Sequence, residues 1–340
     1  MMRLPLFRYE APVSIHHAAE LLAAAPEQTM LVAGGTDLLP NMKRRQQVPS
    51  TLVALRRVAE LKGISEDDGL DIGAGTTLAA LVRDRRIRDS YGALWQAAAQ
   101  IATPLLRNMG TLGGNLCLDT RCNYYDQSYE WRKAIGFCMK KDGAVCWVAP
   151  SSRRCLAVSS ADTPPALIAL GATVSLVGVD GARRIRVADL YQHDGIRYLA
   201  KQPTEILSRV HLGRLHGWRS TYWKVRRRGS FDFPVLSVAA AVKLGPDARV
   251  EDARIVLGAV APRPIEVPAA AAVLIGGPLG AAAIAEATDV ASRPARPMDN
   301  TDFSLHWRKR MTSELVTYAL RELRGDDVRD LRRRIARQAL

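Results

Sequence analysis

Leu31-Val32-Ala33-Gly34-Gly35-Thr36-Asp37-Leu38 is the stretch that decides how the rest of the chain is interpreted. It predicts a short apolar strand that runs into a tight turn at the two glycines. Glycines permit positive φ and let backbone N–H groups approach an anion without a Cβ in the way. Successive N–H groups in such a turn form an anion-binding nest. Most Gly-Gly turns are only turns, so a binding site requires a companion feature.

The companion is a second turn, Gly110-Thr111-Leu112-Gly113-Gly114-Asn115. Two nests fit the pyrophosphate of a dinucleotide, and Thr36, Thr111 and Asn115 offer side-chain hydrogen bonds beside them. Neither turn has the Gly-Lys-Ser/Thr of a Walker loop, and Gly73-x-Gly75 lacks the third glycine of the Rossmann fingerprint. The sequence therefore favours a dinucleotide site of another construction.

Periodic patterns around the two turns indicate mixed helices and strands, which is typical of the α+β or α/β fold class. From Arg219 onward, long strands are followed by helices, so we expect a separate C-terminal α+β domain that starts near Gly217. We expect helices at Ile15–Ala25, Leu78–Ile87, Tyr91–Ile101, Pro165–Leu170, Ala269–Ile275, Ala281–Ala291, Leu305–Arg324 and Asp327–Leu340. We expect strands at Thr29–Ala33, Thr51–Leu55, Gly69–Ile72, Ala172–Val177, Arg184–Val187, Ile206–Leu212, Thr221–Arg227, Val235–Leu244 and Ala253–Val260.

The segment Cys117–Pro165 has little periodicity, which is unusual inside a compact domain unless something else holds it. Four cysteines lie in it with the spacing C-x15-C-x7-C-x8-C, namely Cys122, Cys138, Cys146 and Cys155. Four thiolates in one irregular segment indicate a metal site that supplies the missing order. The absence of a CxxC pair counts against a zinc finger or ribbon, whereas a [4Fe–4S] cluster spreads its ligands over several irons. Structural zinc and four incidental thiols remain as alternatives.

Basic residues surround the four cysteines, and positive charge near a cluster with net negative charge stabilises it. These residues are Arg121, Arg132, Lys133, Lys140, Lys141, Arg153 and Arg154. Cys117 is the odd cysteine, and a small core residue is its simplest role.

Composition narrows the class of protein. The chain has 340 residues and 48% are hydrophobic, which excludes a disordered or collagen-like chain and a disulfide-stapled miniprotein. The net charge of +14 is spread along the chain, so it indicates a solvated or docked surface rather than a nucleic-acid stripe. We expect no signal peptide and no membrane span, because no apolar run reaches about 18–20 residues. We therefore expect a cytoplasmic protein.

Several of these motifs, in this order, resemble the FAD-binding medium subunit of molybdenum hydroxylases, the family that includes xanthine dehydrogenase and carbon monoxide dehydrogenase. They are Ala33–Leu38, Thr111-x-Gly113-Gly114-Asn115, Asp162 before an apolar helix, and Lys224-x-x-x-Arg228. The resemblance covers nearly the whole chain. It implies an α+β chain with a two-subdomain FAD-binding fold of the PCMH/vanillyl-alcohol-oxidase type, an iron–sulfur insertion, and a C-terminal α+β domain of the CO dehydrogenase flavoprotein type. It implies FAD-binding subdomains at 1–57 and 58–216, an insertion at about 117–161, and a C-terminal domain at 217–340.

The same resemblance implies the roles of individual residues. The two turns would hold the FAD pyrophosphate and ribityl chain, Asp162 would bind ribityl or adenosine hydroxyls, Leu207 would pack on the dinucleotide, and Lys224 would lie near the flavin ring. Without the family context, capping of the helix at Thr163-Pro164-Pro165 is the alternative role of Asp162, and an exposed charge is that of Lys224. The implied cofactor-binding residues are Leu31, Val32, Ala33, Gly34, Gly35, Thr36, Asp37, Leu38, Ile101, Gly110, Thr111, Gly113, Gly114, Asn115, Asp162, Leu207 and Lys224.

The tail His306-Trp307-Arg308-Lys309-Arg310 departs from the family's usual Tyr-Arg-Arg pattern, which leaves the contacts of this helix open.

The cysteine-rich insertion resembles that of the β subunit of 4-hydroxybenzoyl-CoA reductase, which carries an extra [4Fe–4S] cluster, and this implies iron rather than zinc. It implies an electron-transfer subunit for reductive dehydroxylation of an aromatic CoA thioester, fed by a carrier such as ferredoxin. The same subunit role in an enzyme that oxidises an aromatic, N-heterocyclic or aldehyde substrate is the alternative. A basic zinc-binding interaction protein is the alternative of another class.

The resemblance also implies a large molybdopterin-binding subunit and a small [2Fe–2S] subunit, in a dimer of heterotrimers. We expect no catalytic acid–base set in this chain, because its six histidines are scattered and no Ser-His-Asp set is evident.

Overall fold

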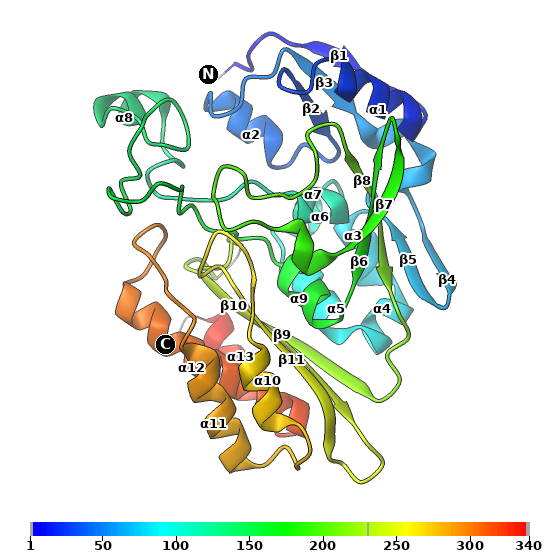
Figure 1. Cartoon of the computed structure of the whole chain (residues 1–340), viewed down its shortest axis with the longest axis vertical. Helices are drawn as coiled ribbons and strands as arrows, with labels where there is room; N and C mark the ends of the chain where they lie inside the picture. Colours follow the sequence, from blue (N-terminus) through cyan, green and yellow to red (C-terminus); the bar gives the residue numbers. More distant parts are fainter. Residues whose placement is uncertain (1–2, 230, 338–340) are drawn as a thin grey trace.

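The computed structural model describes residues 3–229 and 231–337, which form three β-sheets with helices packed on them (Figure 1). The first sheet is parallel, with the strand order β1-β3-β2. Helix α1 joins β1 to β2, and the Ser14 side chain caps it by accepting from the His17 N–H. Helix α2 begins just after the first glycine turn. The elements are β1 (Arg8–Glu10), α1 (Ile15–Ala24), β2 (Thr29–Val32), α2 (Leu38–Lys43) and β3 (Thr51–Ala54), followed by single 3-10 turns η1 (Leu55–Arg57) and η2 (Ala59–Leu61).

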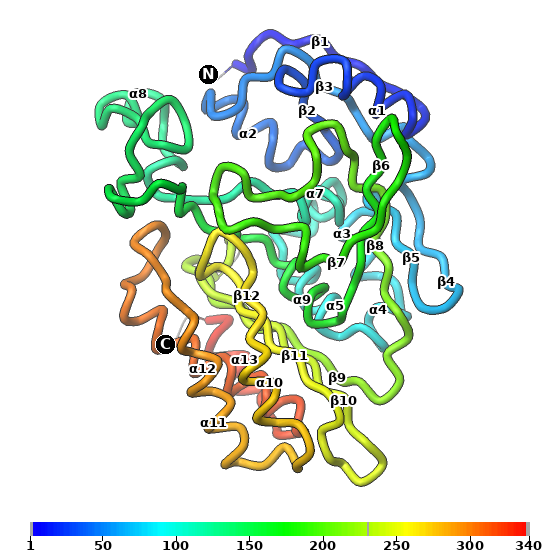
Figure 2. Tube along the Cα trace, in the orientation of Figure 1, coloured from blue at the N-terminus to red at the C-terminus, as the bar shows by residue number. Residues whose placement is uncertain are grey.

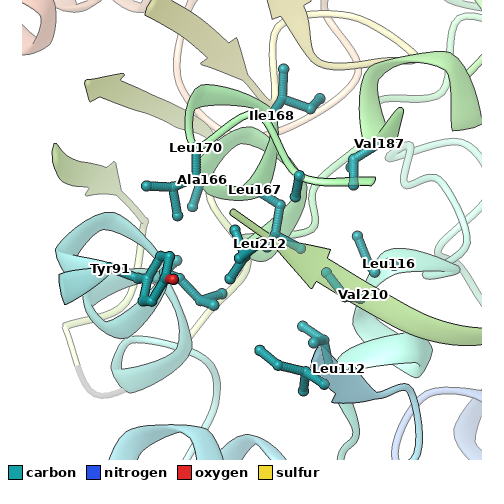
Figure 3. Close-up of a cluster of buried hydrophobic side chains, with 14 of the residues drawn as sticks. Tyr91, Leu112, Leu116, Ala166, Leu167, Ile168, Leu170, Val187, Val210 and Leu212 are labelled. Carbon is teal, nitrogen blue, oxygen red and sulfur yellow. The ribbon is translucent and has the colours of Figure 1, made fainter. Parts of the chain in front are cut away.

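The second sheet is antiparallel, with the order β4-β5-β8-β6-β7, and short helices cover one face of it. Its strands are β4 (Ile64–Asp67), β5 (Gly69–Gly73), β6 (Thr173–Gly178), β7 (Gly181–Arg186) and β8 (Ile206–Leu212). The helices are α3 (Leu78–Arg83), α4 (Arg85–Ser90), α5 (Gly92–Ala99), α6 (Pro104–Arg107), α7 (Leu112–Leu116), α9 (Thr163–Ala169) and η3 (Val187–Leu190). Figure 3 shows their shared core, in which Leu167 of α9 and Val210 of β8 lie among apolar neighbours.

The third sheet is antiparallel, with the order β12-β11-β10-β9, and it is buried on both faces. Along β10, Val238 and Val242 pack on the C-terminal helices, while Ala239 and Ala241 pack on the core of the second sheet. This alternation follows from the period of two along a strand. The elements are β9 (Trp218–Val225), β10 (Leu236–Leu244), β11 (Val250–Gly258), β12 (Ile265–Glu266), α10 (Pro268–Leu274), α11 (Ala281–Ser292), α12 (Leu305–Arg324) and α13 (Arg329–Ala336).

The cysteine segment, residues 117–161, is a long loop between α7 and α9 of the second sheet's helices, and it carries helix α8 (Tyr129–Ala134). At its base, the N–H groups of Arg121 and Val158 each donate to the other's carbonyl, at 2.8 and 2.7 Å. Figure 2 shows the segment in teal and green, between the N-terminal sheet and the C-terminal helices. Hydrogen bonds join it to both, from Gln46 to the Tyr125 carbonyl and from Asn300 to the Leu156 carbonyl.

Most elements lie where the sequence predicts them, and the differences have physical reasons. The predicted helix Leu78–Ile87 is two helices, because the Asp84 side chain accepts from the N–H groups of Arg86 and Ile87 and starts α4. The last helix covers Arg329–Ala336, and the end of the predicted range, 338–340, lies outside the described residues. Within the described residues, no helix is long and apolar enough to cross a membrane. The three sheets support a division at residues 57 and 216, which we keep as a proposal.

Candidate functional site

A cleft of about 1710 Å³ lies where the two glycine turns meet. Sixteen of the seventeen cofactor-binding residues expected from the sequence line it, from both turns and from Ile101, Asp162 and Leu207. Arg228 of the Lys224-x-x-x-Arg228 motif also lines it, and further lining residues that the sequence did not single out come from the segments 192–203 and 231–233. The space is large and lined by both apolar side chains and glycine backbone, which suits an extended dinucleotide.

The first turn presents backbone donors to the cleft. Within the described parts of the chain, the N–H groups of Gly34, Gly35 and Thr36 have no hydrogen-bond partner in the protein. Gly35 has φ +71°, which an L side chain adopts only with strain. A Cβ at Gly34 would lie 2.0 Å from the Met109 carbonyl oxygen, so glycine is required where the two turns touch. This turn fits an anion nest.

The second turn differs from the expectation of a second nest. Its N–H groups are already used, because Leu112 donates to Thr76 O at 2.9 Å and Gly113 donates to Ala74 O at 2.8 Å. The Gly114 N–H donates to the hydroxyl of Thr111 at 3.1 Å. Gly114 is nevertheless exposed, and a Cβ there would meet Thr111 Oγ1 at 3.0 Å and otherwise face the cleft. The second turn therefore provides a close approach of backbone rather than free donors.

Lys224 is the expected cofactor residue that does not line the cleft. Its side chain is fully buried behind Asp162, with Nζ 2.9 Å from Asp162 Oδ1 and 3.2 Å from the Gln100 carbonyl oxygen. Burial lowers the pKa of the Lys224 ammonium, and the Asp162 carboxylate opposes that shift. The hydroxyl of Tyr222 also donates to Asp162, at 2.8 Å. Lys224 and Tyr222 thus fix the Asp162 side chain at the cleft wall, and Lys224 itself does not face the cleft.

Asp162 is not a helix cap through its side chain, although it precedes α9. Asn115 Oδ1 takes that role by accepting from the N–H and the hydroxyl of Thr163, at 3.0 and 2.6 Å. Asn115 therefore joins the second turn to α9. Asp37, in the first turn, is paired with Arg121 and accepts from Asn41 Nδ2 at 3.0 Å. Asp37 and Asp162, two of the acidic residues that line the cleft, are therefore each held by a basic partner.

The four cysteines line one small second cavity. Cys122, Cys138, Cys146 and Cys155 are all free thiols and all buried, 5–7% exposed. Burial raises the pKa of Cys122 to about 12 and that of Cys155 to about 11, so a thiolate there requires a compensating positive centre. Cys117 lies apart from them, in the wall of the cleft.

The cysteine cavity differs from a single-ion site. Within residues 3–229 and 231–337, no three His, Cys, Asp or Glu side chains are arranged to hold one metal ion. Zinc needs its ligands around one ion, whereas the thiolates of a [4Fe–4S] cluster bind separate irons around a larger core. The four thiols therefore share a cavity without surrounding a single-ion site.

Four of the basic residues expected around the cysteines, Arg121, Arg132, Lys140 and Lys141, form ion pairs. Arg121 pairs with Asp37 and Asp126, and its guanidinium stacks on Phe233. Lys140 pairs with Asp119 at 2.8 Å. Sequence reasoning missed Asp119, whose place beside the cleft depends on the path of the inserted segment.

The structure also brings a serine, a histidine and an aspartate together, which the sequence did not indicate. Ser175 Oγ lies 2.7 Å from His211 Nε2, and His211 Nδ1 lies 3.4 Å from Asp71 Oδ1. Strand β6, which carries Ser175, is paired on both edges by β7 and β8, so its N–H groups serve the sheet rather than an oxyanion hole. These three residues do not line the cleft. Sequence reasoning found no Ser-His-Asp set in the chain, and the structure does bring one together, although away from the cleft.

Two family models match the chain. The FAD binding domain in molybdopterin dehydrogenase matches residues 5–214, and the CO dehydrogenase flavoprotein C-terminal domain matches residues 220–323. The aldehyde oxidoreductase FAD-binding subunit PaoB of Escherichia coli is 32% identical, over 92% of this chain and 98% of that protein. The nicotine 6-hydroxylase medium subunit of Paenarthrobacter nicotinovorans is 28% identical, over 93% and 96%.

Among solved structures, a carbon monoxide dehydrogenase from Hydrogenophaga pseudoflava matches with a TM-score of 0.78 and 25% identity. The match covers 95% of this chain and 98% of that one. The two curated relatives above are named as subunits of larger enzymes.

Proposed function

This chain belongs to the family of FAD-binding medium subunits of molybdenum hydroxylases, and we propose that it carries a [4Fe–4S] cluster besides FAD. Cys122, Cys138, Cys146 and Cys155 would each bind one iron. The observation that carries the proposal is that these four thiols of one segment line one buried cavity without pairing as disulfides. The protein would transfer electrons in a three-subunit oxidoreductase of the cytoplasm.

The chain's own residues would bind FAD in the cleft. The free N–H groups of the first turn would donate to the pyrophosphate, and Gly114 would let the dinucleotide approach the second turn. Asp162, held by Lys224 and Tyr222, would accept from cofactor hydroxyls. FAD exchanges one or two electrons and a cluster exchanges one, so the pair supplies a converter between two-electron and one-electron carriers. The protein sets their distance, potential and access to water.

Analysis of the anaerobically purified chain tests both cofactors together. We expect about four irons and one FAD per chain, from the ligand count of the cluster type. One zinc per chain without flavin would support the alternative of a zinc-binding interaction protein and contradict this proposal.

Replacing a single cysteine tests the ligand assignment. Cys138→Ser should remove the cluster absorbance and lower the iron content while FAD remains bound, because Cys138 lines the small cavity and not the cleft. Cys117→Ser is the matched control, since Cys117 lines the cleft, and its iron content should match that of the wild type. An unchanged iron content in Cys138→Ser would show that Cys138 is not a ligand.

The substrate of the whole enzyme has two candidates. The cysteine insertion favours a 4-hydroxybenzoyl-CoA reductase-like activity, in which a low-potential donor such as ferredoxin supplies electrons. The 32% identity to an aldehyde oxidoreductase subunit, over nearly its full length, favours aldehyde oxidation instead. The complex should be tested with 4-hydroxybenzoyl-CoA after chemical reduction, and with an aromatic aldehyde in the oxidised state. Reoxidation of the cofactors by the thioester supports the first activity, and their bleaching by the aldehyde supports the second.

The subunit partners follow from the same proposal. We expect a large molybdopterin-binding subunit and a small [2Fe–2S] subunit to copurify with this chain as a dimer of heterotrimers. Light scattering of the copurified complex measures that mass directly. A stable monomer in the presence of both partners would contradict this assembly.

A further inference from the structure

A buried ion pair separates the FAD cleft from the cysteine cavity. Asp119 lines the cleft, and Lys140 lines the cavity. Lys140 Nζ lies 2.8 Å from Asp119 Oδ1, and the two side chains are 6% and 9% exposed. At this point the two sites are therefore one salt bridge apart.

The Lys140 ammonium is fixed by its neighbours on both sides of this wall. It donates to Thr120 Oγ1 at 2.8 Å and to the Gly195 carbonyl at 2.6 Å. It also lies 4.9 Å from the ring centre of Tyr125, in the cavity wall, and 5.6 Å from that of Tyr198, in the cleft wall. Its three N–H donors are thus satisfied, and the charge has a defined position.

The carbonyl that Lys140 binds belongs to a residue in direct contact with a proposed ligand. The Gly195 N–H donates to the Cys155 carbonyl at 2.8 Å. A Cβ at Gly195 would lie 2.8 Å from Cys155 Sγ, so Gly195 is packed against that sulfur. Gly195 therefore contacts both the Lys140 ammonium and the sulfur of Cys155.

We propose that Lys140 is a positioning residue that sets the reduction potential of the cluster, with Asp119 partly opposing it, and this inference rests on the proposed function. Electron uptake makes the cluster more negative, and a fixed positive charge in a low-dielectric wall stabilises the reduced state. In the transfer one centre loses one electron and the other gains it, and no bond forms or breaks. Because Asp119 lines the cleft, the same ion pair also couples the potential of the cluster to the negative charge that FAD would gain on reduction.

The test is a potentiometric titration of the intact complex, with the reduced cluster followed by electron paramagnetic resonance. Lys140→Met should lower the cluster midpoint. At a fixed potential, the ratio of reduced to oxidised cluster should fall about tenfold, which is about 59 mV for one electron. Asp119→Asn should raise the midpoint, because it leaves the lysine charge unopposed. Lys140→Arg keeps the charge, and Lys141→Met removes a neighbouring charge that pairs with Asp142, so both should match the wild type.

Equal midpoints in all variants with full iron and flavin content would overturn this inference. Shifts of the same sign in Lys140→Met and Asp119→Asn would also overturn it, since a general structural disturbance has no reason to follow the sign of the charge. If Lys140→Met yields no loaded protein, the direction of the shift in Asp119→Asn decides. Wild-type protein without iron or FAD would contradict the proposed function instead.

Discussion

Gly114 is the position at which a small change should separate cofactor binding from folding. Its φ lies outside the left-handed region, and an added Cβ would meet Thr111 Oγ1 at 3.0 Å and otherwise enter the cleft. We expect Gly114→Val to abolish FAD binding because a side chain blocks the approach to the backbone. Flavin content per chain and far-ultraviolet circular dichroism measure the two effects separately.

Gly213→Val is the matched control for that variant. Gly213 is also exposed, has nothing within 4 Å of its added Cβ, and lies outside the cleft lining. It should retain flavin at the wild-type level. Normal flavin occupancy in Gly114→Val would contradict the placement of FAD against the second turn.

His211 should make the protein less stable in mild acid. Burial lowers its pKa below the ordinary value of 6.5, while Asp71 partly opposes the shift and Arg184 and Arg209 add to it. As the pH falls through 6.5, the unfolded chain takes up a proton that the folded His211 resists, so stability is lost. Urea midpoints at pH 7.5 and 5.5 should therefore differ more for the wild type than for His211→Gln. An equal pH effect in both proteins would assign the loss to other groups.

At the scale of single residues, the sequence predicted which side chains surround the cleft but not how they are engaged. The two turns could be predicted because paired glycines indicate a tight turn from the local sequence alone. The partners of the second turn, Ala74 and Thr76, are local to another strand end, and no spacing rule connects them with Gly113. The pairing of Lys224 with Asp162 likewise joins two elements far apart in the chain.

Helix α12 shows how an element is fixed by one buried charge. Arg308 is fully buried, and its guanidinium donates to the carbonyls of Val235, Met298 and Ala259 at 3.0, 2.9 and 2.6 Å. Burial lowers its pKa to about 10. Although the sequence around Arg308 departs from the family pattern, Arg308 makes a defined contact between α12 and the ends of β10 and β11.

Arg308→Lys should destabilise this attachment. A lysine ammonium cannot reach three carbonyls as the planar guanidinium does, and each buried acceptor left unpaired costs about 1–3 kcal/mol, so we expect a loss of roughly 2–4 kcal/mol. Arg310 is exposed on the same helix, and Arg310→Lys should change little. Urea unfolding followed by tryptophan fluorescence compares them, and equal midpoints would show that the three bonds contribute no net stability.

Elements with strong periodicity were predictable, and short ones were not. Leu305–Arg324 and Ile206–Leu212 lie where the sequence placed them, because one has an amphipathic repeat and the other an apolar run. Helices α6 and α7 have four and five residues, which is too short for a period to be visible. Their existence depends on N-caps by Thr103 and Thr111, which sequence reasoning did not weigh.

In the whole molecule, the cysteine segment is attached to all three parts. Gln46 Nε2 donates to the Tyr125 carbonyl at 2.6 Å, from the first part of the chain. Asn300 Nδ2 donates to the Leu156 carbonyl at 2.6 Å, from the last. Gly195, from the second part, is bonded to Cys155. The relative placement of these parts could not be predicted, because it depends on contacts between residues that lie far apart in the chain, 79 positions for Gln46 and Tyr125 and 144 for Asn300 and Leu156.

Removal of iron should therefore change the structure beyond the cysteine segment as well. On the proposed function, chelation under reducing conditions should open residues 117–161 to limited proteolysis, because this segment has one short helix, α8, and the proposed cluster would supply the rest of its order. Hydrogen exchange should also increase near Gln46 and Asn300, whose side chains bind carbonyls of the segment. Mass spectrometry of both the fragments and the exchanged peptides measures this. Unchanged cleavage and exchange after iron loss would show that the protein alone holds the segment.

The threefold attachment of the cysteine segment also dictates a sequence of events during biosynthesis. Its four sulfurs are almost inaccessible once the surrounding parts have closed on them. The proposed cluster would consequently have to be delivered while the newly made chain is still open. In a cell short of iron, the chain without its cluster would then accumulate, rather than an assembled enzyme that lacks only the cluster.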